Sequence, residues 1–331
     1  MPVRPRFVHR VRVRAQRQDR EKPRRVRLSN ITRPVFYIVL TFAVSLFTFY
    51  VFKSWSSRIW RGGTRITVVV ATEDPTIYSY NPQNQSIYKI TVPKNTQVTA
   101  SGGYGTWLVG SLWGLGEQEG VGGKILKNSL QKSLGVSVDA YTNRDGEVLF
   151  ESGKFGLLGA VFQVFKMRNI ETDLTFFDKV NLLMALGQVG RFSRTDIDLV
   201  KRGVIEKGKL SDGLNGYIVV ADRAAVGLDI LRDDKIFVEM KTLKISNASD
   251  VGGLAGEVSR VALVLGIRVL DMGSSNDKYR GVCSVKGGGE QLRSLAARRI
   301  TQIYGCDQSI KELNSAADLE LIIGDRFAKE F

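Results

Sequence analysis

Residues 65–96 read RITVVVATEDPTIYSYNPQNQSIYKITVPKNT, and this stretch decides the fold that we expect. Its opening run, residues 65–71, is apolar and rich in valine, which predicts a buried strand at the start of a domain. Two runs of alternating apolar and polar residues follow at 76–80 and 86–92. The NPQNQ segment between them has turn chemistry, so the two runs predict a β-hairpin.

Helical and strand patterns continue from the hairpin to about residue 235. A helix is expected from 126 to 134, because its apolar spacing is helical and Gly135 suits a C-cap. We expect further strands at residues 136–141 and 217–221 and further helices at residues 176–186, 194–201 and 222–231. The sequence therefore predicts an α/β domain over residues 64–235.

The remaining residues, 236–331, predict a second and smaller domain. Strands are expected at 236–245, 267–272, 281–285 and 317–324, with helices at 254–265 and 290–304. This order, β-α-β-β-α-β, is that of the split βαβ sandwich. The fold class that we expect for the whole folded part is therefore mixed α/β.

An uncharged apolar run precedes both domains. Residues 35–52 read VFYIVLTFAVSLFTFYVF, and a helix of this length spans about 27 Å, close to the thickness of the hydrocarbon core. Trp55 and Trp60 follow at positions typical of interfacial aromatics. A cleaved signal peptide has a shorter apolar region and a small-residue cleavage site, which the following KSWSS does not offer. We therefore expect a transmembrane helix over residues 34–55.

The charge of the chain is concentrated before this helix. The formal net charge is +15, of which residues 1–33 supply +10 through eleven Arg and one Lys against two acids. This asymmetry predicts a cytoplasmic tail over residues 1–33 and a single-pass plasma-membrane protein with an extracytoplasmic body. The tail lacks periodicity, and we expect it to be disordered. Binding of anionic lipid, RNA or DNA by the tail is the alternative to a topology signal, and nucleic acid is the least favoured of these ligands.

Several kinds of site are excluded or disfavoured. The only histidine is His9 in the tail, so the folded part has no Ser-His-Asp triad and no His-ligated metal. The glycine-rich stretch 102–123 contains Gly123-Lys124 but lacks the spacing and the Ser or Thr of a P-loop. Two cysteines, Cys283 and Cys306, are candidates for a disulfide in an oxidising compartment, although their spacing alone leaves the pairing open.

The order of these parts resembles the start of a LytR-CpsA-Psr (LCP) domain. The family pattern I-P-R-D-T-x-V appears here as VPKNTQV at residues 92–98, and L-G-I-x-I-D-x-Y appears as LGVSVDAY at 134–141. The resemblance covers about 80 residues. It implies enzymes that transfer glycopolymers from polyprenyl pyrophosphate carriers onto the bacterial cell wall, with the lipid in an apolar pocket and the pyrophosphate held by magnesium and clustered Arg and Asp.

The candidate site residues follow from this resemblance, and so do the departures from it. The family Arg is Lys94 and the family Asp is Asn95, while Glu73 and Asp74 stand where the family carries its metal-binding acids, without an arginine beside them. Lysine lacks the bidentate fork of arginine, and asparagine supplies no anionic charge to magnesium. Catalytic candidates are thus Asp74, Lys94 and Asn95, and the metal candidates are Glu73 and Asp74.

The glycine-rich stretch adds two aromatic candidates. Trp107 and Trp113 accompany Leu108 and Leu112, so the stretch is interpreted as a flexible surface loop or as the lip of an apolar groove. Together with Lys94, the two tryptophans are the candidate ligand-binding residues. No later arginine-rich motif of the family is found between residues 145 and 235.

Residues 236–331 resemble the LytR C-terminal domain over nearly their whole length. The matching motifs are Asn247-Ala248-Ser249, GLA at 253–255, GIRV at 266–269, Tyr279, GGE at 288–290 and the segment 318–325. The resemblance implies a domain that binds an envelope glycan or a protein partner.

Two functions remain open at this point. The favoured hypothesis is a non-catalytic or weakly catalytic envelope protein that needs no cofactor. Its expected partners are the membrane lipid and an envelope glycan, a lipid-linked precursor or a protein of the envelope. The alternative is an active phosphotransferase that attaches polyprenyl-pyrophosphate-linked glycopolymers to the cell wall, with magnesium held by Glu73 and Asp74. Whether the chain is an enzyme is therefore undecided, with the sequence favouring that it is not.

Overall fold

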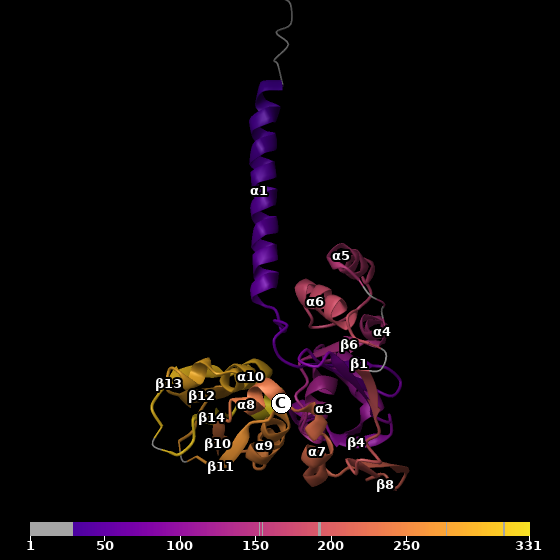
Figure 1. Ribbon diagram of the computed structural model, residues 1–331, viewed down its shortest axis with the longest axis vertical. Coiled ribbons are helices and arrows are strands. Elements are labelled where there is room, and N and C mark those ends of the chain that lie inside the picture. The colour runs from indigo at the N-terminus through magenta and orange to yellow at the C-terminus, as the bar shows by residue number, and fades with distance from the viewer. Residues whose placement is uncertain (1–28, 152, 154, 191–192, 276, 314) are drawn as a thin grey trace, which may run out of the picture. The chain divides into compact units, whose positions relative to one another are not determined.

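The computed structural model is a mixed α/β structure that describes residues 29–151, 153, 155–190, 193–275, 277–313 and 315–331 (Figure 1). Most of the basic tail lies outside these residues, so its predicted disorder stays a prediction. The chain divides into two compact units, residues 1–52 and 53–331. Each unit is described by itself.

The apolar run forms one continuous helix, α1 (Ser29–Ser56), within which residues 35–56 are long and apolar enough to cross a membrane. Its large apolar side chains are exposed; Phe36 and Phe47 are 62% and 69% exposed. The hydroxyls of Thr41 and Thr48 donate to the carbonyls of Tyr37 and Val44 one turn earlier. Such bonds satisfy a polar side chain without water, which suits a helix surrounded by lipid.

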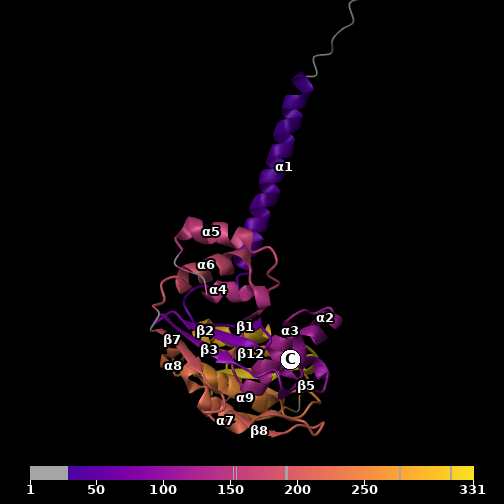
Figure 2. The same cartoon turned by 90° about the vertical axis from the view of Figure 1, so that its right-hand side faces the viewer.

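Sheet A begins the second unit, with the strand order β6-β1-β2-β3-β7. All of these strands except β6 are labelled in Figure 2. Its strands are β1 (Ile66–Ala71), β2 (Thr76–Asn81), β3 (Ser86–Thr91), β6 (Ala140–Asn143) and β7 (Arg194–Ile197). The hairpin β2–β3 is antiparallel, and β1 pairs in parallel with β6. The predicted strand and hairpin are therefore present.

Both faces of sheet A are buried, which explains the continuous apolar run of β1. Val68 and Val70 face one core cluster beside α4 (Val148–Glu151), α5 (Leu157–Lys166) and α6 (Phe176–Leu186). Val69 faces a second cluster that includes α2 (Leu112–Gln118) and α3 (Lys124–Leu134). Because side chains alternate along a strand, neighbouring valines fill opposite cores.

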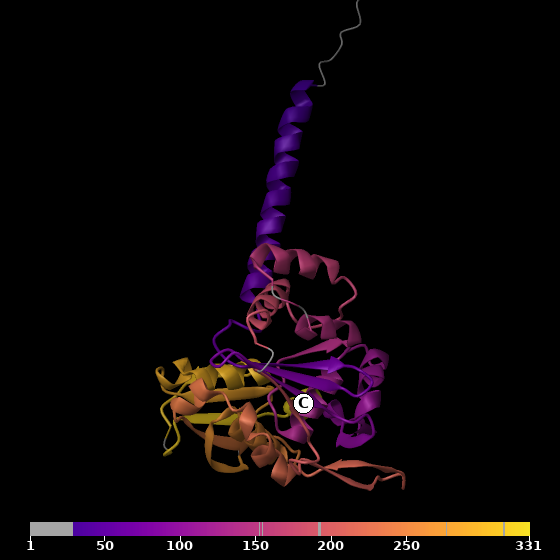
Figure 3. The same cartoon turned by 45° about the vertical axis from the view of Figure 1, so that its right-hand side comes forward.

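A smaller sheet B has the order β5-β4-β9-β8. It consists of β4 (Thr96–Thr99), β5 (Thr106–Leu108), β8 (Ile205–Lys209) and β9 (Asn215–Val219). Figure 3 shows the β8–β9 hairpin extending beyond the neighbouring helices. The short helices α7 (Ala221–Gly227) and α8 (Asp234–Val238) follow this hairpin along the chain.

Sheet C contains the strands of residues 242–323 in the order β11-β10-β14-β12-β13. Its strands are β10 (Thr242–Asn247), β11 (Arg268–Ser274), β12 (Cys283–Gly287), β13 (Asp307–Ile310) and β14 (Leu319–Ile323). Its helices are α9 (Leu254–Leu265), α10 (Leu295–Tyr304) and α11 (Phe327–Glu330). The predicted β-α-β-β-α-β order is found with one extra strand, β13, between α10 and the last strand.

Short one-turn 3-10 helices complete the secondary structure. They lie at Ser101–Gly103 (η1), Val109–Ser111 (η2), Arg144–Glu147 (η3), Asp229–Leu231 (η5) and Gln291–Arg293 (η6).

Several predicted elements differ in the structure. The strand expected over residues 136–141 begins only at Ala140, as β6, and the helix expected over 290–304 begins at Leu295 after the 3-10 turn η6. Residues 194–201, expected to be a helix, contain strand β7, because residues 194–197 pair in parallel with β3. The strand expected from residue 236 begins at Thr242, because Asp233 caps the short helix α8 through the amide of Lys235. The helix expected over 222–231 is broken into α7 and a 3-10 turn.

Candidate functional site

Three segments that carry the candidate residues converge on one edge of sheet A. Strands β1 and β6 are parallel, and Ala71 at the end of β1 lies opposite Asn143 at the end of β6. Thr91 at the end of β3 lies opposite Thr76, where β2 begins. The turn of residues 72–75, the loop after β3 and the 3-10 turn η3 (Arg144–Glu147) therefore leave the sheet at the same edge.

Glu73, Asp74 and Lys94 are brought together at this edge. The ammonium group of Lys94 forms an ion pair with the carboxylate of Glu73. The backbone amide of Lys94 donates to Oδ1 of Asp74 at 2.7 Å, and the hydroxyl of Thr72 donates to the carbonyl oxygen of Asp74 at 2.6 Å. The side chains of Glu73 and Lys94 are 77% and 57% exposed, so the cluster is open to water.

The charges of this cluster act on one another. The hydrogen bond from Lys94 and its positive charge hold the pKa of Glu73 below its ordinary value, and Arg144 acts in the same direction. The same hydrogen bond raises the pKa of Lys94. Arg144 comes from η3, seventy residues along the chain, so the edge has an arginine although the sequence has none next to Glu73 or Asp74.

The two carboxylates form at most part of a magnesium site. Among the described residues there is no group of three or more His, Cys, Asp or Glu side chains arranged to hold a metal ion. Glu73 is already paired with Lys94, and Asp74 already accepts from the Lys94 amide. Magnesium sites commonly use one or two carboxylates, with waters and substrate phosphates completing the octahedron, so two acids engaged in this way supply at most part of a coordination shell.

Asn95 belongs to the junction with sheet B rather than to the acidic cluster. Its carbonyl oxygen accepts from the amide of Tyr217 on β9 at 3.1 Å. A Cβ atom at Gly216 would lie 2.5 Å from that carbonyl oxygen, so the close approach requires glycine there. Asn95 also lines a groove of about 500 Å³ formed with the β8–β9 hairpin, which carries Lys207 and Lys209.

The glycine-rich stretch is structured, and its two tryptophans have different partners. Trp107 on β5 is 37% exposed and donates its indole N–H to the carbonyl of Tyr104 at 2.8 Å. Trp113 on α2 donates to Glu117 at 2.9 Å and packs edge-on against Tyr141. The alternative of a flexible surface loop does not match the strand, the 3-10 turns and the helix α2 found here.

Several polar contacts of the interior escaped the sequence reasoning. Asp139 and Arg299 form a bidentate ion pair whose side chains are 1% and 4% exposed. Asp173 accepts from Lys127 and from the amide of Tyr141, both at 2.8 Å, and burial raises its pKa. These pairs join segments that are distant in sequence, so spacing offers no signal for them.

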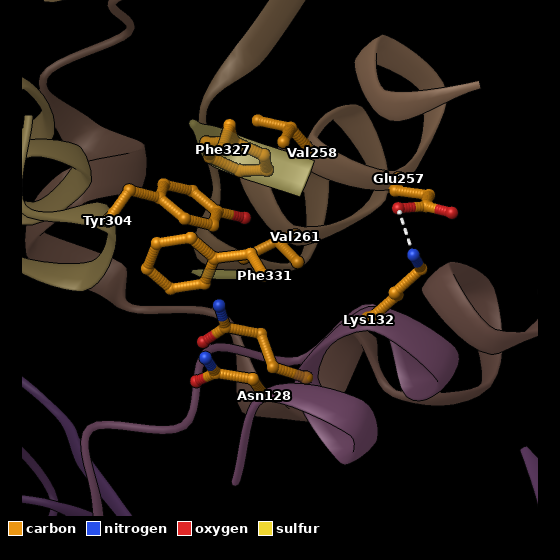
Figure 4. Close-up of a pocket in the computed structure, with 9 residues that line it drawn as sticks. Asn128, Lys132, Glu257, Val258, Val261, Tyr304, Phe327 and Phe331 are labelled. Atoms are coloured by element: carbon orange, nitrogen blue, oxygen red, sulfur yellow. Dashed lines mark ion pairs between the residues drawn. The ribbon is translucent and has the colours of Figure 1, made fainter. Parts of the chain in front are cut away.

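A small pocket of about 20 Å³ lies between α3 and the C-terminal residues (Figure 4). Phe331 packs against Tyr304, with ring centroids 5.3 Å apart, and the amide of Asn128 donates to the carbonyl of Glu330 at 2.7 Å. Lys132 and Glu257 form an ion pair at its rim. A cavity of this volume holds no organic ligand, so the feature is a packing seam.

The two cysteines lie in the core around sheet C. Cys283 on β12 and Cys306 just before β13 are joined by a disulfide, with their Cα atoms 4.6 Å apart. Strand β13 pairs in parallel with β12, so the bond links two neighbouring segments.

No protein-family model matches the chain, and no curated protein matches it. Solved structures with a similar course of the chain include TagV from B. subtilis, which is 9% identical, with 50% of this chain and 95% of that chain covered at a TM-score of 0.37. They also include the LytR-CPS2A-psr family protein YwtF (TagT) with bound octaprenyl pyrophosphate lipid, at 9% identity, 51% and 90% coverage and a TM-score of 0.37.

A third is a transcriptional regulator from Enterococcus faecalis, at 11% identity, 51% and 86% coverage and a TM-score of 0.35. Similarities at this level carry no conclusion about activity or ligand. A function is therefore proposed from the residues of this chain itself.

Proposed function

We propose that this chain is a membrane-anchored protein of the bacterial cell envelope whose outer body binds a lipid-linked glycan precursor or an envelope glycan without transferring it. The observation that carries the proposal is the state of the acidic cluster. Both acids expected to hold magnesium are engaged by Lys94, Glu73 through its side chain and Asp74 through its backbone amide. An ion pair between Glu73 and Lys94 favours a polar binding edge over a metal centre.

The anchor rests on α1. The most apolar window of 18 residues within residues 35–56 has a mean hydropathy of 2.2, and no side chain of this window is buried. A uniformly apolar and exposed helix suits lipid. The excess of arginine in residues 1–33 favours a cytoplasmic N-terminus, which leaves residues 64–331 outside.

Binding at the cluster rests on its two cations, of which Lys94 also pairs with Glu73. Lys94 and Arg144 supply positive charge at the edge of sheet A, and Lys207 and Lys209 line the neighbouring groove beside Asn95. Phosphate and sugar-phosphate groups are held by such donors through charge-assisted hydrogen bonds. Residues 236–331, which resemble the LytR C-terminal domain, supply a second surface for a glycan or a protein partner.

An equilibrium binding measurement tests the proposal. Full-length protein in detergent micelles is titrated with a fluorescent polyprenyl pyrophosphate, and the dissociation constant is compared between wild type, Lys94→Ala and Lys241→Ala as a matched control. Lys241 carries the same charge but lies at the start of β10, where it pairs with Asp318. We expect Lys94→Ala to weaken binding by about tenfold and Lys241→Ala to leave it unchanged, since a charged hydrogen bond contributes about 1.5–3 kcal/mol. Equal affinities for all three proteins would contradict the proposed site.

A further inference from the structure

A groove next to the end of α1 is lined by five basic side chains. Its volume is about 470 Å³, and no Asp or Glu lines it. The basic residues are Arg58, Arg61, Lys235, Arg298 and Arg299. We call this feature the basic groove. It is formed by the segment after α1, by α8 and by α10, so it is separate from the cluster around Glu73 and Lys94.

Most of this charge is not compensated by acids. Among the residues that the structure describes, Arg58, Arg61, Lys235 and Arg298 form no ion pair with an Asp or Glu. Asp178, next to the segment 58–61, accepts instead from the backbone amides of Ile59 and Trp60 at 3.1 and 2.9 Å. Four positive charges gathered on one concave surface attract an anion strongly, because like charges are costly to hold together.

A buried donor in the wall also lacks a partner. Arg299 is 4% exposed, and its terminal nitrogens bind Asp139, but its Nε–H has no hydrogen-bond acceptor among the described residues. Buried N–H groups are nearly always satisfied in native proteins, so the Nε–H of Arg299 is an unusual buried donor behind the wall of the groove. This observation is independent of the charge count.

The walls of the basic groove are held in place. Arg58 stacks on the ring of Trp55 at 3.3 Å from its centroid and donates to the Trp55 carbonyl at 2.9 Å. The indole of Trp60 donates to the carbonyl of Thr64 at 2.8 Å, and Gln302 of α10 donates to the carbonyl of Ile59. The segment after α1 is therefore attached to α10, which reduces the cost of ordering the arginines on binding.

We propose that the basic groove binds a phosphate group, either in the headgroup of an anionic phospholipid or in a soluble phosphate ester. Arginine forks match phosphate oxygens bidentately, and the volume suits a headgroup-sized ligand. The inference rests on the proposed anchor for its access to lipid. Arg58 lies two residues beyond Ser56, the last residue of α1, which limits their separation to about 7 Å.

The test uses full-length protein in zwitterionic detergent micelles and isothermal titration calorimetry. The titrants are dihexanoyl phosphatidylglycerol, dihexanoyl phosphatidylcholine and inorganic pyrophosphate. The variant is Arg61→Gln with Arg298→Gln, and the control is Arg268→Gln with Arg280→Gln, which removes the same charge from exposed positions outside the groove. We expect the groove variant, but not the control, to lose about tenfold or more in affinity for the preferred anion.

The titrants distinguish the source of the phosphate. Tight binding of phosphatidylglycerol with weak binding of pyrophosphate assigns a lipid headgroup, and the reverse assigns a soluble phosphate compound. Equal affinity of wild type and groove variant for every titrant overturns the inference. So does an equal loss in the control, which would indicate a general charge effect. Binding of polyprenyl pyrophosphate at Lys94 is measured in the groove variant as well. If that binding is intact while phosphate binding in the groove is lost, the two sites are separate, and the result for one does not decide the other.

Helix α5 carries a second inference from a different observation. Leu158, Phe162 and Phe165 are 84%, 63% and 66% exposed on a helix of ten residues, while Ala160 and Val164 on its other side are buried in a core cluster. An apolar face of this size on a short exposed helix marks an interaction surface. Lys166 lies 4.6 Å from the centroid of the Phe162 ring, so a basic group accompanies the apolar face.

A series of aromatic contacts connects this face to the end of α1. Phe165 packs against Phe176 with centroids 5.3 Å apart, Phe176 against Phe177 at 5.6 Å, and Phe177 against Trp55 at 5.2 Å. Trp55 lies in the last turn of α1 and belongs to the same compact unit as α5. The aromatic contacts thus run from the apolar face to Trp55, three residues beyond Phe52, within one compact unit.

We infer that α5 lies in the interfacial layer of the bilayer that α1 spans, with Leu158, Phe162 and Phe165 among the acyl chains. Apolar residues on one face with a flanking cation are typical of interfacial helices. The experiment places a single engineered cysteine in full-length protein, labels it with an environment-sensitive dye and measures quenching by spin-labelled lipids in proteoliposomes. The positions are Phe162→Cys, Phe47→Cys within α1, and Ser211→Cys between β8 and β9.

We expect quenching at positions 47 and 162 but not at 211. Quenching at 47 without quenching at 162 overturns the placement of α5 and leaves the anchor intact. Absence of quenching at both 47 and 162 contradicts the anchor itself. Quenching at all three positions would show that the dye partitions on its own and would remove the support for α5.

Discussion

Arg299 of α10 and Asp139 next to β6 form a bidentate ion pair across 160 residues of sequence. Its N–O distances are 2.5 and 2.7 Å, and the side chains are 4% and 1% exposed. Asp139 also accepts from the amide of Thr67 on β1 at 2.7 Å, and Arg299 also donates to the hydroxyl of Ser137 at 3.2 Å. One pair therefore links the segment around sheet C to the first parallel strands of sheet A.

Removing one partner of this pair is expected to destabilise the fold strongly. Asp139→Asn leaves the Arg299 guanidinium buried without a counter-charge, which costs about 3–5 kcal/mol of unfolding free energy. Guanidinium unfolding of the full chain in detergent, followed by tryptophan fluorescence, measures the change. Arg326→Ala breaks an exposed ion pair with Glu330 and should cost at most about 1 kcal/mol. Similar losses of unfolding free energy in both variants would contradict the expectation that the buried ion pair stabilises the fold more than the exposed one.

The disulfide is expected to stabilise the region of sheet C. Cys283 and Cys306 are 23 residues apart, and closing a loop of this size contributes about 2–4 kcal/mol. Cys283→Ala with Cys306→Ala should lower the unfolding midpoint, and dithiothreitol should lower that of wild type but not that of the variant. Rapid maleimide labelling of both thiols in protein isolated without reductant would contradict the bond.

In the glycine-rich stretch 102–123, substitution by alanine is expected to destabilise the protein at one glycine and to stabilise it at another. A Cβ atom at Gly110 would lie 2.7 Å from Cβ of Lys94, whereas a Cβ atom at Gly114 meets nothing within 4 Å. Gly110→Ala should displace Lys94, cost about 1–3 kcal/mol and weaken polyprenyl pyrophosphate binding. Gly114→Ala, within α2, should stabilise by about 0.5–1 kcal/mol and leave binding unchanged. Unfolding and binding curves of both variants decide, and a neutral Gly110→Ala would contradict the packing against Lys94.

The carboxylate of Glu73 is expected to titrate below its ordinary range. The pKa of Glu73 is lower in the folded state than in the unfolded chain. The ion pair therefore stabilises the folded state fully at a pH above the ordinary glutamate pKa of about 4.3. This stabilisation is lost as the pH falls through the lower pKa of the folded state. Carbon-13 NMR titration of the side-chain carboxyl measures it, with Glu73→Gln identifying the signal. Lys94→Ala should raise this pKa more than Arg144→Ala, and an unchanged pKa in Lys94→Ala would contradict the pairing.

Local patterns were sufficient for the elements whose neighbours are close in sequence. The hairpin β2–β3, the helix α3 with Gly135 at its C-cap and the helix α9 all follow from periodicity and turn chemistry. Strand β7 was wrongly predicted as a helix, because its structure depends on pairing with β3 more than a hundred residues earlier. Strand β13 was missed because its four residues are all exposed and carry no apolar alternation.

The candidate site was only partly accessible to the same reasoning. Glu73, Asp74 and Lys94 were singled out through a resemblance, and the structure brings them together. Arg144 reaches the same edge only because β6 is parallel to β1. The basic groove joins Arg58 and Arg61 to Arg298, some 240 residues away, and no spacing in the sequence indicates that these arginines meet.

Under the proposed function, the body of the chain binds a lipid-linked glycan and does not transfer it. A transfer assay on the full chain in proteoliposomes, with a radiolabelled polyprenyl-pyrophosphate glycan, peptidoglycan as acceptor and magnesium, tests this most directly. We expect saturable retention of label in the lipid-bound fraction, and no magnesium-dependent label on peptidoglycan in wild type or Asp74→Ala. Magnesium-dependent transfer that is present in wild type and lost in Asp74→Ala would contradict it.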